Sequence, residues 1–255
     1  GLNMLSCTFF AVYWVLLHYF AAIVVLHMYT DHFAMRFLRD NMPSDDAGKL
    51  SAGFLSNNVT LAYAAFDKAP WRDTINDELF MNYILPYAQL NEEREEWREN
   101  LMSIAGPIVK DCTTATEAAL ALNEKLFSGL NVKYSTERNR ADQAPSETIE
   151  TGLASCTGLS ILLADACRAV GVPARVAGIA KWPDGEGNGP YYGVTTWTQK
   201  QGAGPASGEA RKKMSQTAKE NDWGSNWLWL FRVGGKSTTA VATSYSNYAD
   251  MEPPE

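Results

Sequence analysis

The sequence predicts an α+β fold, with helices in the first half of the chain and strands towards its end. Residues 31–135 carry helical patterns. An apolar helix then begins at Cys156, and residues 172–179 follow it as a strand. Residues 226–233 and 238–245 are two further predicted strands. A chain of 255 residues is long enough for one medium domain or a small pair with a sizeable core.

The first 30 residues form a separate apolar leader without Asp, Glu, Lys or Arg. Within it, residues 8–28 are long enough to cross a bilayer, which favours a membrane anchor or an uncleaved signal. His18 and His27 weaken this interpretation, as does the missing basic start of a secretory signal. A buried helix and a misread frame are the alternatives. We therefore expect a membrane-anchored or exported protein, with a cytoplasmic location as the alternative.

Residues 31–135 form the predicted helical region. Thr114 and Glu117 have the spacing of a capping box, and the helix that they open should end near Gly129. Residues 91–100 are rich in acids and arginines at i,i+3 and i,i+4 spacing, so they predict a solvated helical face. Residues 131–134 are predicted to form a short strand. The third part of the chain comprises residues 136–255.

The helix at Cys156 is the segment with the clearest chemistry. Ser155 or Thr157 can cap its start, and Gly171 suits its left-handed end. Free N–H groups and the helix dipole at Cys156 favour an anion and can activate a thiol. The alternative is a small buried cysteine with no chemical role. The predicted buried stripe consists of Leu159, Leu162, Leu163, Ala166 and Val170.

Other polar residues of this helix receive structural interpretations. Cys167 lies three turns after Cys156 and close to the buried stripe, so it is predicted to be core. Asp165 and Arg168 are predicted to be solvated or salt-bridged rather than catalytic.

Residues 147–179 resemble the transglutaminase-like superfamily, a group of papain-like cysteine enzymes. The matching pattern runs from Glu147 through Cys156-Thr157-Gly158 to Gly171-Val172-Pro173-Ala174-Arg175. The resemblance is weaker from about residue 35, is lost after about residue 188, and is greatest to a bacterial branch with an N-terminal helical region. It implies a papain-like core, irregular or incomplete after 188, in which the Cys156 helix packs on a small antiparallel sheet.

The resemblance implies a Cys-His-Asp triad acting on peptide or protein amides, by acyl transfer or hydrolysis through a thioester. Cys156 matches the nucleophile, and the backbone N–H groups of Cys156 and Thr157 match the oxyanion site. The family's histidine follows a Gly-Asn pair, but here Gly189 follows that pair, and a shifted alignment places Thr195 there. Neither residue can act as a general base. The family's aspartate should follow about fifteen residues after the histidine, but after Thr195 the first aspartate of this chain is Asp222.

Three interpretations of the missing base remain open. The chain is an impaired transglutaminase-like enzyme, or an inactive, membrane-tethered module that binds peptides, or one of His18, His27 and His32 supplies the base. A further hypothesis is that residues 1–30 and 189–235 are read in a shifted frame. Another frame that encodes His and Asp at the family spacing would support it.

Composition excludes several other classes of function. The net charge of −7 and the lack of a basic stripe with aromatics argue against nucleic-acid binding. The sequence has no phosphate loop, dinucleotide fingerprint or zinc spacing, so neither a cofactor nor a metal is predicted. Four irregularly spaced cysteines, Cys7 and Cys112 among them, do not describe a disulfide framework or a redox pair.

Overall fold

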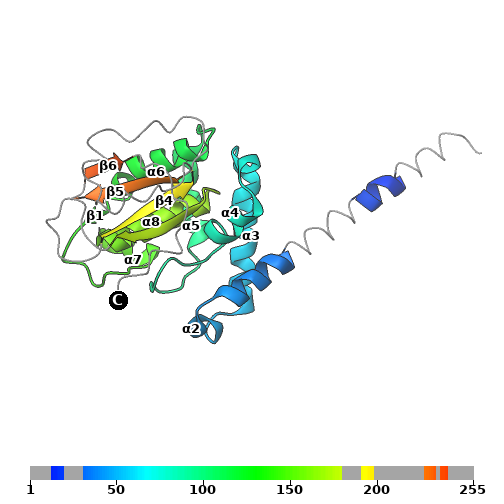
Figure 1. Ribbon diagram of the computed structural model, residues 1–255, viewed down its shortest axis with the longest axis horizontal. Helices are drawn as coiled ribbons and strands as arrows, with labels where there is room; N and C mark the ends of the chain where they lie inside the picture. Colours follow the sequence, from blue (N-terminus) through cyan, green and yellow to red (C-terminus); the bar gives the residue numbers. More distant parts are fainter. Residues whose placement is uncertain (1–12, 20–30, 180–190, 198–226, 234–235, 241–255) are drawn as a thin grey trace, which may run out of the picture. The chain divides into compact units, whose positions relative to one another are not determined.

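The computed structural model describes residues 13–19, 31–179, 191–197, 227–233 and 236–240 of the chain (Figure 1). The chain forms two compact units, residues 1–60 and 61–255. In the first, residues 13–19 and 31–41 are helical, and α2 (Ser44–Ala47) follows. Helix α3 (Ala52–Lys68) runs from the first unit into the second.

The apolar leader is described only over residues 13–19. Aromatic and aliphatic side chains of this short helix, such as Trp14 and Leu16, are exposed. The rest of residues 8–28 lies outside the described residues. Among the described helices, none is both long and apolar enough to span a membrane.

The second unit contains most of the helices. After η1 (Arg72–Thr74) these are α4 (Asp77–Tyr83), α5 (Trp97–Val109), α6 (Ala115–Gly129), α7 (Pro145–Thr151) and α8 (Cys156–Ala169). The capping box at α6 is confirmed: the Thr114 side chain accepts from the Glu117 N–H, and the Glu117 carboxylate accepts from the Thr114 N–H. This helix ends at Gly129, where the sequence predicted its end.

Two small sheets accompany these helices. Strands β1 (Lys133–Tyr134) and β2 (Leu153–Ala154) pair in parallel. An antiparallel sheet has the order β3-β4-β5-β6, formed by β3 (Ala174–Ile179), β4 (Tyr191–Trp197), β5 (Trp227–Val233) and β6 (Lys236–Ala240).

The strand predictions are confirmed at β1, β3 and β5. The predicted strand 238–245 overlaps the end of β6, and its residues 241–245 lie outside the described residues. Strand β4 had no periodic signal, because glycines surround it. Its place in the sheet comes from pairing with β3 on one side and β5 on the other.

Helix α8 contacts β3 and β4, and α5, α6 and α7 also pack on it (Figure 1). The expected α+β arrangement is confirmed: a helical region comes first, and the Cys156 helix packs on a small antiparallel sheet. The prediction of one buried stripe was too narrow, because every residue from Thr157 to Ala169 is buried. Helices and sheet together surround α8, so its polar residues are enclosed as well.

Close packing fixes the end of α8 at Gly171. Its φ of 76° lies in the left-handed region, as predicted. A Cβ at this position would lie only 2.9 Å from the Ala65 carbonyl oxygen, so no larger residue fits without movement. The Trp71 indole N–H donates to the Gly171 carbonyl at 2.8 Å. The turn into β3 is therefore held by the backbone of α3 and by an indole.

The prediction of a solvated helix over residues 91–100 is wrong. Helix α5 begins only at Trp97, and the residues before it are not helical. Glu92 and Arg98 are buried. The Glu92 carboxylate accepts the backbone N–H groups of Gln89 and Leu90, at 2.6 and 2.8 Å. These bonds give the carboxylate partners inside the protein, so the segment follows the core instead of forming a solvent-facing helix.

Candidate active site at the start of the Cys156 helix

Cys156 is the first residue of α8, and its side chain is half-buried. Of the two predicted caps, the structure uses Ser155, whose Oγ accepts the Gly158 N–H at 3.0 Å. The Ser155 hydroxyl donates to the Ala141 carbonyl at 2.6 Å. The cap is thus bonded to the helix on one side and to the loop before α7 on the other.

Two backbone N–H groups remain available in the first turn of α8. The Gly158 N–H is bonded to the Ser155 hydroxyl, and the Leu159 N–H is bonded to the Ser155 carbonyl at 3.0 Å. Within the described part of the chain, the N–H groups of Cys156 and Thr157 have no acceptor, as expected for a helix start. They lie beside the thiol, where an oxyanion formed from an acyl group needs donors.

The other side of this first turn is tightly packed. A Cβ at Gly158 would lie 3.1 Å from the Ala154 Cβ and 3.5 Å from both the Cβ and the Oε1 of Gln143. Gln143 is completely buried, and its Nε2 donates to the Leu153 carbonyl at 3.0 Å. The sequence analysis did not identify Gln143. The only sequence signal was a glycine inside a helix, which often marks a close approach.

The loop before α7 is tied to neighbouring elements by charged groups. The Arg140 guanidinium contacts the carboxylates of Glu147 in α7 and Glu93 before α5, at 2.9 and 3.6 Å. The Glu95 carboxylate accepts both the backbone N–H and the hydroxyl of Ser146 at the start of α7. Two ion pairs of Arg140 and the hydrogen bonds between Glu95 and Ser146 therefore hold the chain that leads to Cys156.

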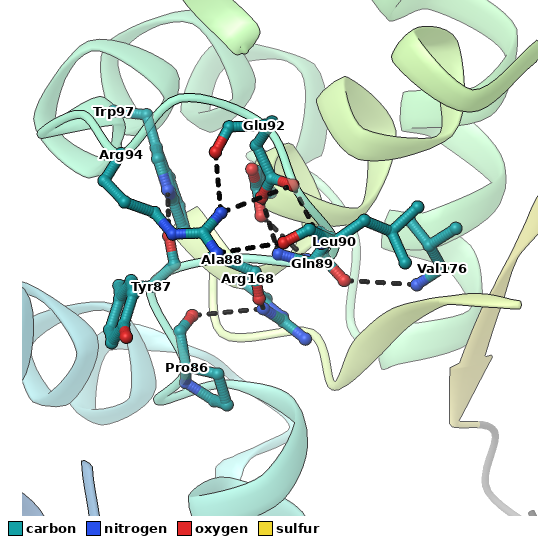
Figure 2. A network of polar contacts seen from close by, with 11 residues as sticks. Pro86, Tyr87, Ala88, Gln89, Leu90, Glu92, Arg94, Trp97, Arg168 and Val176 are labelled. Atoms are coloured by element: carbon teal, nitrogen blue, oxygen red, sulfur yellow. Dashed lines mark hydrogen bonds and ion pairs between the residues drawn. The ribbon is translucent and has the colours of Figure 1, made fainter. Parts of the chain in front are cut away.

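The far half of α8 carries a buried polar network. Asp165 and Arg168 are buried, so the prediction that they are solvated is wrong, although the two groups do interact electrostatically. The Asp165 Oδ1 accepts from the Gln89 Nε2 at 2.8 Å, and the Gln89 Oε1 accepts the Val176 N–H of β3 at 3.1 Å (Figure 2). The Gln89 amide thus joins α8 to β3. Its acceptor end faces an N–H, so its donor end faces the carboxylate.

Two buried arginines hold the segment between α4 and α5 through its carbonyl groups. The Arg168 guanidinium donates to the carbonyls of Pro86 and Ala88, at 3.1 and 2.9 Å (Figure 2). It also donates to the carbonyls of Tyr83 and Ala174. The Arg98 guanidinium donates to the carbonyls of Ile84, Leu85 and Pro86. Backbone carbonyl groups therefore satisfy donors of both buried cations.

Burial shifts the pKa values of this network. Removal from water raises the pKa of Asp165 to about 8, although the charges of Arg168 and Arg98 oppose this effect. Burial also lowers the pKa of Arg98 to about 9 and of Arg168 to about 10, so both stay charged at neutral pH. These groups lie in the interior, away from the start of α8, and belong to the core.

Histidine is absent from the whole second unit, because the sequence has only His18, His27 and His32. Thr195, the residue in the aligned histidine position, lies on β4, which contacts α8. It pairs with Arg175 of β3 and with Trp229 of β5. Gly189 and Asp222 lie outside the described residues.

The remaining cysteines differ from Cys156. Cys167 is fully buried, as predicted, and burial raises the pKa of its thiol. Cys112 is half-buried, and its thiol pKa is raised by burial and by Glu117. Cys7 lies outside the described residues. Among the described residues, no three His, Cys, Asp or Glu side chains are grouped as metal ligands.

A helix that begins with a cysteine and lies on a small antiparallel sheet is the arrangement expected of a papain-like core. Residues 102–223 match the family model of the transglutaminase-like superfamily, and the resemblance is therefore confirmed for this part of the chain. The match continues past Asn188, further than the sequence pattern alone indicated.

A solved structure, that of a candidate cysteine protease from Cytophaga hutchinsonii, is similar with 17% identity and a TM-score of 0.38. The match covers 49% of this chain and 39% of that one, so the chain spans well under half of that protein. No curated protein matches the sequence.

Proposed function

We propose that this chain is a transglutaminase-like cysteine enzyme for peptide or protein amides, impaired because its general base is missing. The observation that carries this proposal is the position of Cys156, half-buried on the first turn of a long buried helix, beside two N–H groups that find no acceptor among the described residues. A thiol in that position can form a thioester, and the N–H groups of Cys156 and Thr157 can bind the oxyanion.

The reaction needs a proton acceptor, and residues 61–255 contain no histidine to serve as one. The Cys156 thiol must lose its proton, its sulfur then bonds to the acyl carbon, and the bond from that carbon to nitrogen breaks. The leaving amine must take up a proton, and water later hydrolyses the thioester. Histidine normally carries the proton through these steps. Without it we expect turnover to fall by roughly 10²- to 10⁴-fold.

Added imidazole tests the proposal, because it can replace the missing side chain. In the full chain, we expect iodoacetamide to label Cys156 rapidly at about pH 6 and Cys112 slowly. Ammonia release from a glutamine peptide should be close to background and should rise with imidazole. The Cys156→Ala variant should lose this rise. Cys112→Ala, which removes a cysteine that is also half-buried, should keep it.

Other results point elsewhere. If Cys156 labels no faster than Cys112, it is not an activated nucleophile and the proposal fails. Turnover at the rate of an intact triad enzyme without imidazole would show that the base is present after all.

The second candidate function is an inactive module that binds peptides. It is favoured by the absence of histidine from residues 61–255 and by Thr195 in the aligned position. A glutamine peptide that binds the chain, measured by calorimetry, without ammonia release at any imidazole concentration would establish this alternative.

A further inference from the structure

Gln143 is fully buried although it lies in a loop, which is unusual because glutamine side chains are mostly exposed in proteins. Its Nε2 donates to the Leu153 carbonyl at 3.0 Å, and the Thr151 hydroxyl lies 3.4 Å from the same nitrogen. Its Oε1 has no partner among the described residues. A buried acceptor without a partner costs about 1–3 kcal/mol, so a stability role alone does not explain this glutamine.

The side chain lies beside the first turn of α8, at the distance of an ordinary van der Waals contact with a Cβ at Gly158. Its Cβ and Oε1 are each 3.5 Å from the position that a Cβ at Gly158 would occupy. Two residues along a helix rotate by about 200°, so Gly158 faces away from the side on which Cys156 projects. Gln143 therefore packs behind the nucleophile, on the side opposite its thiol.

The same loop also holds the helix cap. The Ala141 carbonyl accepts from the Ser155 hydroxyl, and the Ser155 oxygen accepts the Gly158 N–H. The bond from Gln143 to Leu153 fixes the strand β2 immediately before the cap. Loop residues 141–143 therefore fix the direction in which the chain enters α8. They also pack on the side of the first turn that faces away from the thiol.

We propose that Gln143 is a positioning residue that aims the N–H groups of Cys156 and Thr157 by bracing the first turn of α8. This inference rests on the proposed function for its consequence, the reactivity of Cys156. The amide donor holds β2, and the rest of the side chain fills the space behind the first turn of the helix. Without the donor, the Leu153 carbonyl keeps only the bond from the Thr151 hydroxyl, the cap at Ser155 loosens, and the N–H groups lose their alignment with the thiol.

The Gln143→Met variant tests this brace, because methionine has a similar volume and no donor. We expect the rate of Cys156 alkylation to fall about fivefold, as for loss of a helix cap, with its pH midpoint moved upward. Alkylation of Cys112 in the same molecules should not change. The matched control is Thr148→Val, which replaces another buried polar side chain without a partner, in α7. It should leave Cys156 unchanged.

A double-mutant cycle with Ser155→Ala separates positioning from a general loss of stability. If both residues act through the first turn, their effects on the alkylation rate are not additive. Additive effects would overturn the proposal, as would a Gln143→Met variant that keeps the wild-type rate and pH midpoint.

Amide hydrogen exchange gives a measurement that does not depend on thiol chemistry. The N–H groups of Gly158 and Leu159 are bonded to Ser155, so Gln143→Met should speed their exchange while the rest of α8 stays protected. Faster exchange in a protein whose Cys156 is unreactive would support the positioning role of Gln143 and contradict the proposed function. Unchanged exchange would contradict the positioning role. If Gln143→Met does not fold, Gly158→Ala, whose Cβ would lie only 3.1 Å from the Ala154 Cβ, disturbs the packing of β2 on the first turn from the helix side and should give the same two changes.

Discussion

The two ends of α8 are held by different chemistry. At its start, neutral hydrogen bonds of Ser155 and Gln143 hold a half-buried cysteine beside two N–H groups to which no described residue offers an acceptor. Towards its end, buried ionisable groups hold the helix to the segment between α4 and α5: Asp165 accepts from Gln89, and Arg168 donates to Ala88. Figure 2 shows Gln89, Ala88 and Arg168 in this network.

This difference suggests a division of roles along one helix. The charged end has many partners and is fully enclosed, so removing one group leaves other buried polar groups unsatisfied. The neutral end has few partners and borders the half-buried thiol. Substitutions at the charged end should therefore act on stability, and those at the neutral end should act mainly on the reactivity of Cys156.

The largest effect is expected for Arg168→Met. The guanidinium donates to four backbone carbonyls, and their loss should reduce the free energy of unfolding by about 3–5 kcal/mol. Urea denaturation measures this change. The matched control is Arg72→Met, an exposed arginine beside Asp67 and Asp73, which should change stability by less than about 1 kcal/mol. Equal losses of unfolding free energy in Arg168→Met and Arg72→Met would contradict the stabilising role assigned to the C-terminal end of α8.

A pH-dependent effect of comparable size is expected for Asp165→Asn. Burial raises the pKa of Asp165 to about 8, against a value of about 4 in an unfolded chain. Between these values the folded chain binds one more proton than the unfolded chain, so stability falls as pH rises, by about 1.4 kcal/mol per pH unit. Asparagine keeps an acceptor for Gln89 but does not titrate.

Urea denaturation of both proteins at pH 5, 6, 7 and 8 gives the test. All other groups contribute equally to both curves, so the difference between them isolates Asp165. The variant should gain stability relative to the wild type as pH rises. Parallel curves would show that Asp165 is already ionised in the folded chain, and the two arginines would then outweigh burial.

The smallest effect on stability is expected for Ser155→Ala at the neutral end. Loss of the cap should lower the free energy of unfolding by about 1 kcal/mol. The same variant should slow the alkylation of Cys156, because the Gly158 N–H loses its acceptor and the first turn frays. Thermal unfolding and alkylation kinetics measure the two effects. A stability loss as large as that of Arg168→Met would remove the contrast between the two ends.

Local patterns in the sequence predicted the local features well. The capping box at Thr114, the helix start at Cys156 and the left-handed Gly171 all depend on residues within one or two turns of each other. The charge pattern of residues 91–100 failed for the opposite reason. The Arg98 guanidinium donates to backbone carbonyls 12 to 14 residues earlier in the chain, a separation that no helical spacing reveals.

The sequence by itself determined that Cys156 opens an apolar helix, that a strand follows Gly171, and that the second unit has no histidine. Only the tertiary structure decided that α8 is enclosed on all sides, that Gln89 links it to β3, and that Gln143 packs behind the nucleophile. Helix starts and ends depend on short-range hydrogen bonds, which a sequence encodes within a few residues. Buried amides and guanidiniums find their partners across long separations, and only the folded chain brings those partners together.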